Sequence, residues 1–129
     1  MPKYDANLFD PPAPLAQVVL RSPENTGDLS SASMLLDSGA DVTLIPSASA
    51  NQLDLTTDPN GVYELMGFDG SRTFASAVHL EMIFLNKIFR GRFLLIDQEW
   101  GVIGRDILNL VSLSLDGPNL VWSEQVASR

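Results

Sequence analysis

The amino-acid sequence predicts a small, closed all-β domain with one short helix near its C-terminal end. Apolar residues recur with a period of two in most segments, which is the pattern of half-buried strands. Turn-forming residues, such as Asp69-Gly70, separate these runs. Only Arg105–Val111 has a convincing helical pattern. Many short strands joined by turns are typical of a barrel that closes on itself.

The N-terminal half is expected to start with an extended arm, residues 1–13, followed by a single domain over residues 14–124. Residues 2–14 carry four of the eight prolines. The polar stretch Ser22–Ser33 is rich in turn formers, so we expect an exposed, mobile loop there. The other elements expected in this half are strands at Ala16–Leu20, 34–37 and 42–45, and a helical turn at Pro46–Leu53 that Ser47 could cap.

The C-terminal half is dominated by a long strand with clear alternation. Within Thr73–Leu85, the apolar residues Val78, Leu80, Met82 and Phe84 share one face, and His79, Glu81, Ile83 and Leu85 share the other. His79 on the other face is expected to be a half-exposed cross-strand residue. We expect residues 125–129 to fray. The remaining strands are expected at Val62–Phe68, Ile88–Ile96, Val102–Ile103, 112–115 and 120–123.

Composition limits the function classes open to the chain. With 129 residues, 45% of them apolar, a single folded domain is expected. The formal charge of −8 argues against a nucleic-acid partner, because phosphates would be repelled. One histidine and no cysteine give no structural zinc set, and no phosphate-binding loop or G-x-S-x-G motif is present, so no metal or cofactor is expected. The chain shows neither a signal peptide nor an apolar run of about 20 residues, so we expect a cytoplasmic protein without a membrane span.

The most informative stretch is Met34–Pro46, in which one acidic residue stands between two apolar runs. Asp37 is followed by the turn formers Ser38 and Gly39. A carboxylate at a turn between two core strands is partly desolvated and still reachable by a substrate, which suits an acid or a base. Taken alone, this triplet is far more often a solvated turn between two strands, and the wider context has to distinguish the two.

The wider context resembles the active-site loop of the retropepsins, the retroviral-type aspartic proteases. Leu35-Leu36-Asp37-Ser38-Gly39-Ala40 fits each step of that family's pattern. A second segment, Val102-Ile103-Gly104-Arg105-Asp106-Ile107-Leu108, is similar to the family's apolar-apolar-Gly-Arg-(Asn/Asp) segment at the start of its helix. The resemblance spans residues 14–124 and implies a retropepsin-like acid-protease barrel that cleaves peptides or proteins, with Gly104 near Asp37.

The resemblance also implies a role for each residue of these motifs. Asp37 would be catalytic, and Ser38 would hydrogen-bond across a dimer axis. Gly39 and Asp41 would bind the substrate main chain, with Ala40 between them in the loop, and Arg105 would form an ion pair with Asp41. The family's flap, the hairpin that closes over substrate, would correspond to Met66, Gly67, Phe68, Asp69 and Gly70. Gly104, Arg105 and Asp106 would support the loop, although Arg105 and Asp106 could also be surface charges at a helix start.

A single Asp-Ser-Gly triplet implies a homodimer, because two carboxylates must share one proton for this hydrolysis. Each chain would supply one Asp37 about a two-fold axis. The retroviral members carry an arginine before the first strand that reaches the partner's loop. Here that stretch is Phe9-Asp10-Pro11-Pro12-Ala13, so we expect the dimer to be secured differently, with the C-terminal hairpin that ends Leu120-Val121-Trp122 as a candidate. Trp122 could equally be a core residue.

Two functions from different classes fit the sequence. The first is a homodimeric aspartic endopeptidase that hydrolyses peptide bonds in extended, mainly apolar segments. The alternative is a non-catalytic module with the retropepsin fold, used for dimerisation or peptide binding. The intact motif around Asp37 favours the enzyme, because a binding module has no need for that carboxylate.

Overall fold

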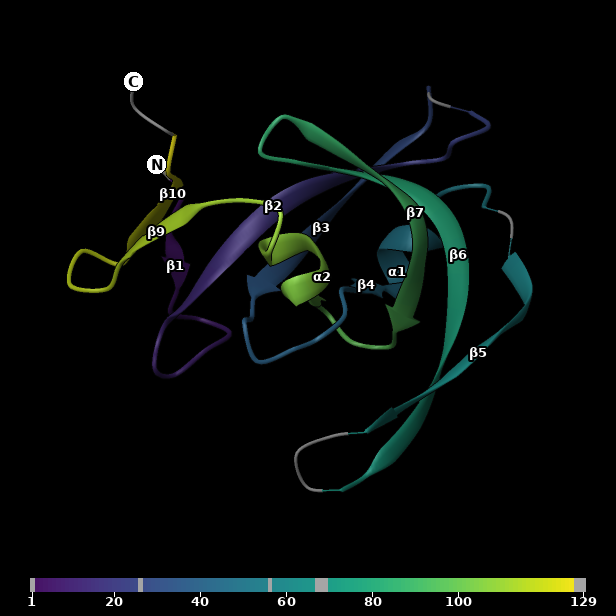
Figure 1. Ribbon diagram of the computed structural model, residues 1–129, viewed down its shortest axis with the longest axis horizontal. Coiled ribbons are helices and arrows are strands. Elements are labelled where there is room, and N and C mark those ends of the chain that lie inside the picture. The colour runs from purple at the N-terminus through teal and green to yellow at the C-terminus, as the bar shows by residue number, and fades with distance from the viewer. Residues whose placement is uncertain (1, 26, 56, 67–69, 127–129) are drawn as a thin grey trace.

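Ten strands and two short helices form the described part of the chain, which comprises residues 2–25, 27–55, 57–66 and 70–126 of the computed structural model (Figure 1). In chain order they are β1 (Tyr4–Asp5), β2 (Ala13–Arg21), β3 (Leu29–Leu36), β4 (Leu44–Pro46), α1 (Ser47–Ala50), β5 (Thr57–Met66), β6 (Arg72–Phe84), β7 (Lys87–Ile96), β8 (Gly101–Ile103), α2 (Arg105–Leu108), β9 (Leu113–Asp116) and β10 (Val121–Glu124). No helix among these residues is long and apolar enough to cross a membrane.

Six of the strands close into a barrel in the order β2-β3-β8-β4-β7-β6, and β6 returns to β2. The pairs β3–β8 and β4–β7 are parallel, whereas β2–β3, β4–β8, β6–β7 and the closing pair β2–β6 are antiparallel. The β5 strand pairs with the part of β6 that projects beyond the barrel (Figure 1). The predicted fold, a small closed all-β barrel with a short C-terminal helix, is confirmed.

The barrel interior is filled by alternate residues of the closing strands. On β6 the predicted face is the buried one, with Leu80 and Met82 fully inaccessible to solvent. Leu20 on β2 and Met34 on β3 meet them with the same complete burial. His79, on the opposite face of β6, is exposed and lies across from Arg92. Apolar burial of this kind contributes about 25 cal/mol per Å² of surface removed from water, so this face holds the barrel together.

The loop predicted over Ser22–Ser33 is too long, because β3 already begins at Leu29. Ser30 is buried there, and its Oγ donates to the Ser49 carbonyl oxygen at 2.8 Å. A hydroxyl that finds a backbone acceptor can be buried without a large penalty. This partner lies 19 residues away and cannot be identified from the local pattern.

Both helices are short. The helical turn expected at Pro46–Leu53 contains the four-residue helix α1, and Ser47 does not cap it, because its Oγ donates to the Ile96 carbonyl oxygen at 3.2 Å. The helix predicted over Arg105–Val111 ends at Leu108, and a turn completes the segment.

The two ends of the chain pair with each other beside the barrel (Figure 1). Lys3 bridges Val121, the Tyr4 amide donates to the Leu120 carbonyl oxygen at 2.9 Å, and β1 also pairs with β2. Within the segment 125–129 that was expected to fray, residues 127–129 lie outside the described part, and the Gln125 amide donates to the Ser112 carbonyl oxygen at 2.7 Å. Trp122 is a core residue, 3% exposed, and its Nε1 donates to the Leu15 carbonyl oxygen.

Candidate active site

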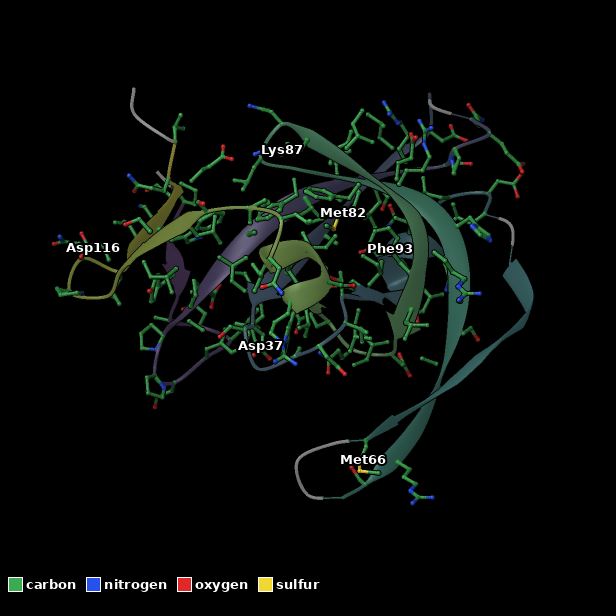
Figure 2. All side chains as sticks on the ribbon, in the orientation of Figure 1. Asp37, Met66, Met82, Lys87, Phe93 and Asp116 are labelled. Carbon is green, nitrogen blue, oxygen red and sulfur yellow. The ribbon has the colours of Figure 1, made fainter. Side chains whose placement is uncertain are left out.

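Asp37 lies just after β3, at the start of the loop that leads to β4 (Figure 2). Its amide donates to the Ile103 carbonyl oxygen of β8 at 3.1 Å, and its carbonyl oxygen accepts from the Ala40 amide at 3.1 Å. The Asp37 Oδ1 accepts from the Gly39 amide at 2.9 Å, which forms a local turn of the kind that aspartate favours. The carboxylate is half-buried, so the loop orients it while leaving it reachable from solvent.

The start of α2 braces this loop. The Arg105 amide donates to the Ala40 carbonyl oxygen at 2.9 Å, and the Arg105 Nη1 donates to the Ser38 carbonyl oxygen at 2.8 Å. The predicted ion pair between Arg105 and Asp41 is not formed in the described part of the chain. The Arg105 guanidinium instead binds the Ser38 carbonyl oxygen. The turn at Asp37 presents the Ser38 carbonyl oxygen to the guanidinium, and Asp41 is left exposed.

Asp106 ties the same helix to the far end of the loop. Its Oδ1 accepts from the Thr43 hydroxyl at 2.7 Å and its Oδ2 from the Thr43 amide at 3.1 Å. The Thr43 Oγ1 in turn accepts from the Gly104 amide at 3.1 Å, so one hydroxyl serves as donor and acceptor. Thr43 is only 2% exposed, and sequence reasoning missed its role. The available signal was a hydroxyl residue within the apolar run Val42–Ile45.

The backbones of the two segments approach each other closely at Gly104. A Cβ at this position would lie 2.5 Å from the Val42 carbonyl oxygen and 2.6 Å from the Val42 carbonyl carbon. Only glycine allows such an approach without a shift of backbone. The two sequence motifs, more than 60 residues apart, therefore form one rigid unit around Asp37.

The β5–β6 hairpin forms where a flap was expected. In Figures 1 and 2 it projects from the barrel on the side where Asp37 lies, and Met66 marks the end of its described part. Met66 pairs with Arg72 and is 68% exposed, and Gly70 has a φ of +82°, which favours glycine. The expected flap residues Gly67, Phe68 and Asp69 lie outside the described residues.

One chain presents a single oriented carboxylate at this loop. Two of the pockets among the described residues, of about 500 and 560 Å³, are lined by residues other than 37–41 and 104–106. The same part of the chain contains no group of three His, Asp or Glu side chains placed to hold a metal ion. A lone carboxylate can accept a proton from water, but hydrolysis by a shared proton needs a second carboxylate opposite the first.

Comparison with solved structures shows which known proteins share this architecture. The chain is similar to EIAV protease in complex with the inhibitor HBY-793, with 22% sequence identity and a TM-score of 0.58 over 75% of this chain and 86% of that one. It is also similar to the foamy viral protease-reverse transcriptase in complex with an RNA/DNA hybrid, with 16% identity and a TM-score of 0.50 over 74% of this chain and 12% of that one. No protein-family model and no curated protein matches the sequence. The chain has the retropepsin-like fold of the retroviral proteases.

Proposed function

We propose that the protein is a homodimeric aspartic endopeptidase whose catalytic pair is Asp37 and the Asp37 of a second copy. In this reaction one carboxylate of the pair is charged and accepts a proton from water, while the other is protonated and donates to the carbonyl oxygen of the scissile peptide bond. Water adds to the carbonyl carbon to give a tetrahedral intermediate. The carboxylate that took the proton of water passes it to the nitrogen, a hydroxyl of the intermediate returns a proton to the other carboxylate, and the C–N bond breaks to release the amine and the carboxylic acid. The substrate class that fits is a peptide or protein segment in extended conformation.

The observation that carries the proposal is the orientation of the Asp37 carboxylate. The bond from the Gly39 amide fixes Oδ1, and the bonds of Arg105 to the loop carbonyl oxygens of Ser38 and Ala40 fix the backbone beneath it. A surface turn without a function would not need bracing from a helix that lies more than 60 residues away. Preorganisation of this kind supports catalysis, because the reacting group does not have to be ordered during the reaction.

The neighbouring residues take their proposed roles from their positions in the same loop. Ser38 and Gly39 are exposed beside the carboxylate, so the Ser38 hydroxyl would meet its symmetry mate and the Gly39 carbonyl would accept from the substrate backbone. Asp41 is exposed and would accept from the substrate main chain. The β5–β6 hairpin would close over the bound segment, as mobile hairpins do in other enzymes.

The C-terminal hairpin is the proposed dimer contact. Among the described residues β9 pairs only with β10, so its outer edge is open to another strand. Leu115 on this strand is 58% exposed, and Leu120 in the adjoining turn is 42% exposed. A second copy about a two-fold axis would cover this edge and the two leucines together.

The decisive experiment compares a peptide-library digest by the wild type with that by Asp37→Asn. The amide is nearly isosteric with the carboxylate and cannot act as a base, so cleavage should disappear while the melting temperature changes little. Asp54→Asn is the matched control, because Asp54 is exposed and lies outside this loop. Residual cleavage by Asp37→Asn above a few per cent of wild type would remove Asp37 from the catalytic role.

The same preparation separates the enzyme from the non-catalytic module. A transition-state inhibitor of aspartic proteases should raise the melting temperature of the wild type, because a ligand that binds only the folded state stabilises it. A folded dimer that neither cleaves the library nor responds to the inhibitor would favour the module.

A further inference from the structure

The outer surface of the barrel opposite β6's buried face carries an unusual set of side chains. The antiparallel register places Arg21 of β2, Glu81 of β6 and Arg90 of β7 in one row across three neighbouring strands. Two residues along each strand, Val19, Ile83 and Ile88 form a parallel apolar row. We name these two rows, together with Leu29 and Arg92 at their margins, the outer arginine face.

Glu81 organises the two central arginines. It is 1% exposed although it points away from the core, and its two oxygens accept from the Arg21 Nε at 2.8 Å and the Arg90 Nε at 2.5 Å. Each guanidinium is therefore anchored through one nitrogen, which leaves its terminal amino groups for further acceptors. The Arg90 side chain is 73% exposed and the Arg21 side chain 21% exposed, so Arg90 is the more accessible of the two.

The charge of this face opposes the charge of the whole chain. Its central row of Arg21, Glu81 and Arg90 has a formal excess of one positive charge, whereas the chain carries 16 acidic residues and a net charge of −8. The neighbouring apolar row is also accessible, since Ile88 is 52% and Leu29 is 60% exposed. Anchored guanidiniums beside accessible aliphatic side chains are typical of protein interaction surfaces, in which arginine is enriched.

We propose that the outer arginine face is a docking site for an acidic protein segment that also carries apolar side chains. Neighbouring strands lie about 4.8 Å apart, so the backbones of Arg21 and Arg90, on either side of Glu81, are separated by about 10 Å. Two carboxylates at that spacing would each reach one guanidinium, and an apolar side chain between them would cover Ile83 and Ile88. Both halves of the face are then used by the same segment.

The chemistry favours a protein over a nucleic acid as the occupant. Phosphodiester strands would gain nothing from the apolar row, whereas a protein segment can present carboxylates and aliphatic side chains together. The face also lies away from the candidate active site. In Figure 2 Lys87, in the β6–β7 hairpin next to Ile88, is at the opposite side of the molecule from Asp37. A segment bound here would leave the Asp37 loop accessible.

The test measures binding and does not depend on peptidase activity. The probe is a fluorescein-labelled peptide of 12 residues built from repeated Glu-Glu-Leu, titrated with the full chain carrying Asp37→Asn so that no cleavage interferes. Comparison probes replace each Glu by Gln, replace each Leu by Ser, or consist of a 12-nucleotide thymidine strand. Fluorescence anisotropy should rise with the Glu-Glu-Leu probe only, and the affinity should fall at high salt because the contacts are partly ionic.

Variants of the face then assign the site. Added to that chain, Arg90→Gln with Arg92→Gln should weaken binding about tenfold, and Ile88→Ser about threefold, as expected for loss of two exposed charges and one partly exposed aliphatic contact. Ile88→Ser leaves the Glu81 ion pairs intact, so it keeps the test valid if the arginine variant unfolds. Lys3→Gln and Leu8→Ser are the matched controls elsewhere on the chain and should stay within about twofold.

Four results would overturn the proposal. They are absence of binding to the Glu-Glu-Leu probe, equal weakening by Lys3→Gln, equally tight binding of the Ser-substituted peptide or the thymidine strand, and a change of sedimentation coefficient in Ile88→Ser. The third would reduce the face to general anion attraction. The fourth would identify the occupant as a second copy of this chain.

Discussion

The close contact between Gly104 and Val42 allows us to predict how much stability is lost when the backbone that supports the Asp37 loop is disturbed. In Gly104→Ala the new Cβ would lie 2.5 Å from the Val42 carbonyl oxygen, 2.6 Å from its carbonyl carbon and 2.9 Å from its nitrogen. All three neighbours are backbone atoms, so no side chain can rotate away. Gly104 has a φ of −93°, which alanine adopts readily, so the effect should come from overcrowding alone.

The magnitude follows from these distances. Overpacking by one methyl group costs about 1–3 kcal/mol, and a Gly-to-Ala change returns about 0.4–1 kcal/mol by restricting the unfolded chain. Because all three backbone atoms lie under 3.0 Å from the new Cβ, the upper end of the overpacking range, about 3 kcal/mol, applies, and the net loss in the free energy of unfolding should be about 2 kcal/mol. For a chain of 129 residues the entropy of unfolding is about 270 cal/mol/K, so the melting temperature should fall by about 7 °C.

Thermal unfolding followed by far-ultraviolet circular dichroism measures this shift. The matched control is Gly91→Ala on β7, where an added Cβ has no atom within 4 Å and stability should stay the same or rise slightly. If Gly104→Ala melted within about 2 °C of that control, well short of the shift expected from the entropy of unfolding, the tight approach of the two motifs would not be a property of the folded protein. The variant should also lose peptidase activity at temperatures where it is folded, because a displaced Val42 moves the loop that orients Asp37.

Three further predictions concern pH and concentration. Peptidase activity should follow a bell-shaped curve on the acidic side, because two carboxylates cannot share a proton when both are charged or both neutral; a rate that still rises through pH 8 would contradict this. Hydrogen bonds lower the pKa of Glu81 from its ordinary value of 4.5, the one from Arg90 having the larger effect and the one from Arg21 the smaller. The stability that the charged Glu81 contributes is therefore present above pH 4.5 and is lost as the pH falls through the lowered pKa. Urea titrations of wild type and Glu81→Gln should therefore differ most above pH 4.5 and converge only when the pH falls below the lowered pKa of Glu81, and a constant difference at every pH would refute that origin. Activity per subunit should fall on dilution, and moderate salt should restore it by screening the charge of −8 on each chain. Sedimentation measured beside the peptidase assay tests both expectations. A fully active monomer would exclude a site built from two Asp37 carboxylates.

The period-two pattern was sufficient to predict the long strand of the barrel and its buried face. Val78, Leu80, Met82 and Phe84 are all buried, because alternation along a strand directly encodes which side meets the core. The start of β3 could not be predicted in this way. Ser30 has no apolar signature, and only the distant Ser49 carbonyl explains its burial.

The candidate site shows the same division between local and distant information. The Asp37 turn is local, since its stabilising bond comes from Gly39 two residues away. The bond from Arg105 to the Ser38 carbonyl oxygen depends on how the loop backbone is oriented, so the residue types alone suggested an ion pair with Asp41 instead. The burial and the two ion pairs of Glu81 could not be predicted from the sequence either, because Arg21 and Arg90 become its neighbours only when β2 and β7 pair with β6.

The separation between barrel and interface has a consequence for how the proposed dimer would respond to dilution. The barrel closes within one chain through β2–β6, and its core, the Asp37 loop and the α2 brace all come from the same chain. The proposed contact at β9 lies outside that closed sheet. A dissociated subunit should therefore stay folded with Asp37 still oriented, unlike obligate dimers whose subunits unfold on separation. Loss of activity on dilution should then occur without loss of far-ultraviolet circular dichroism, and reassociation should restore activity without a refolding step.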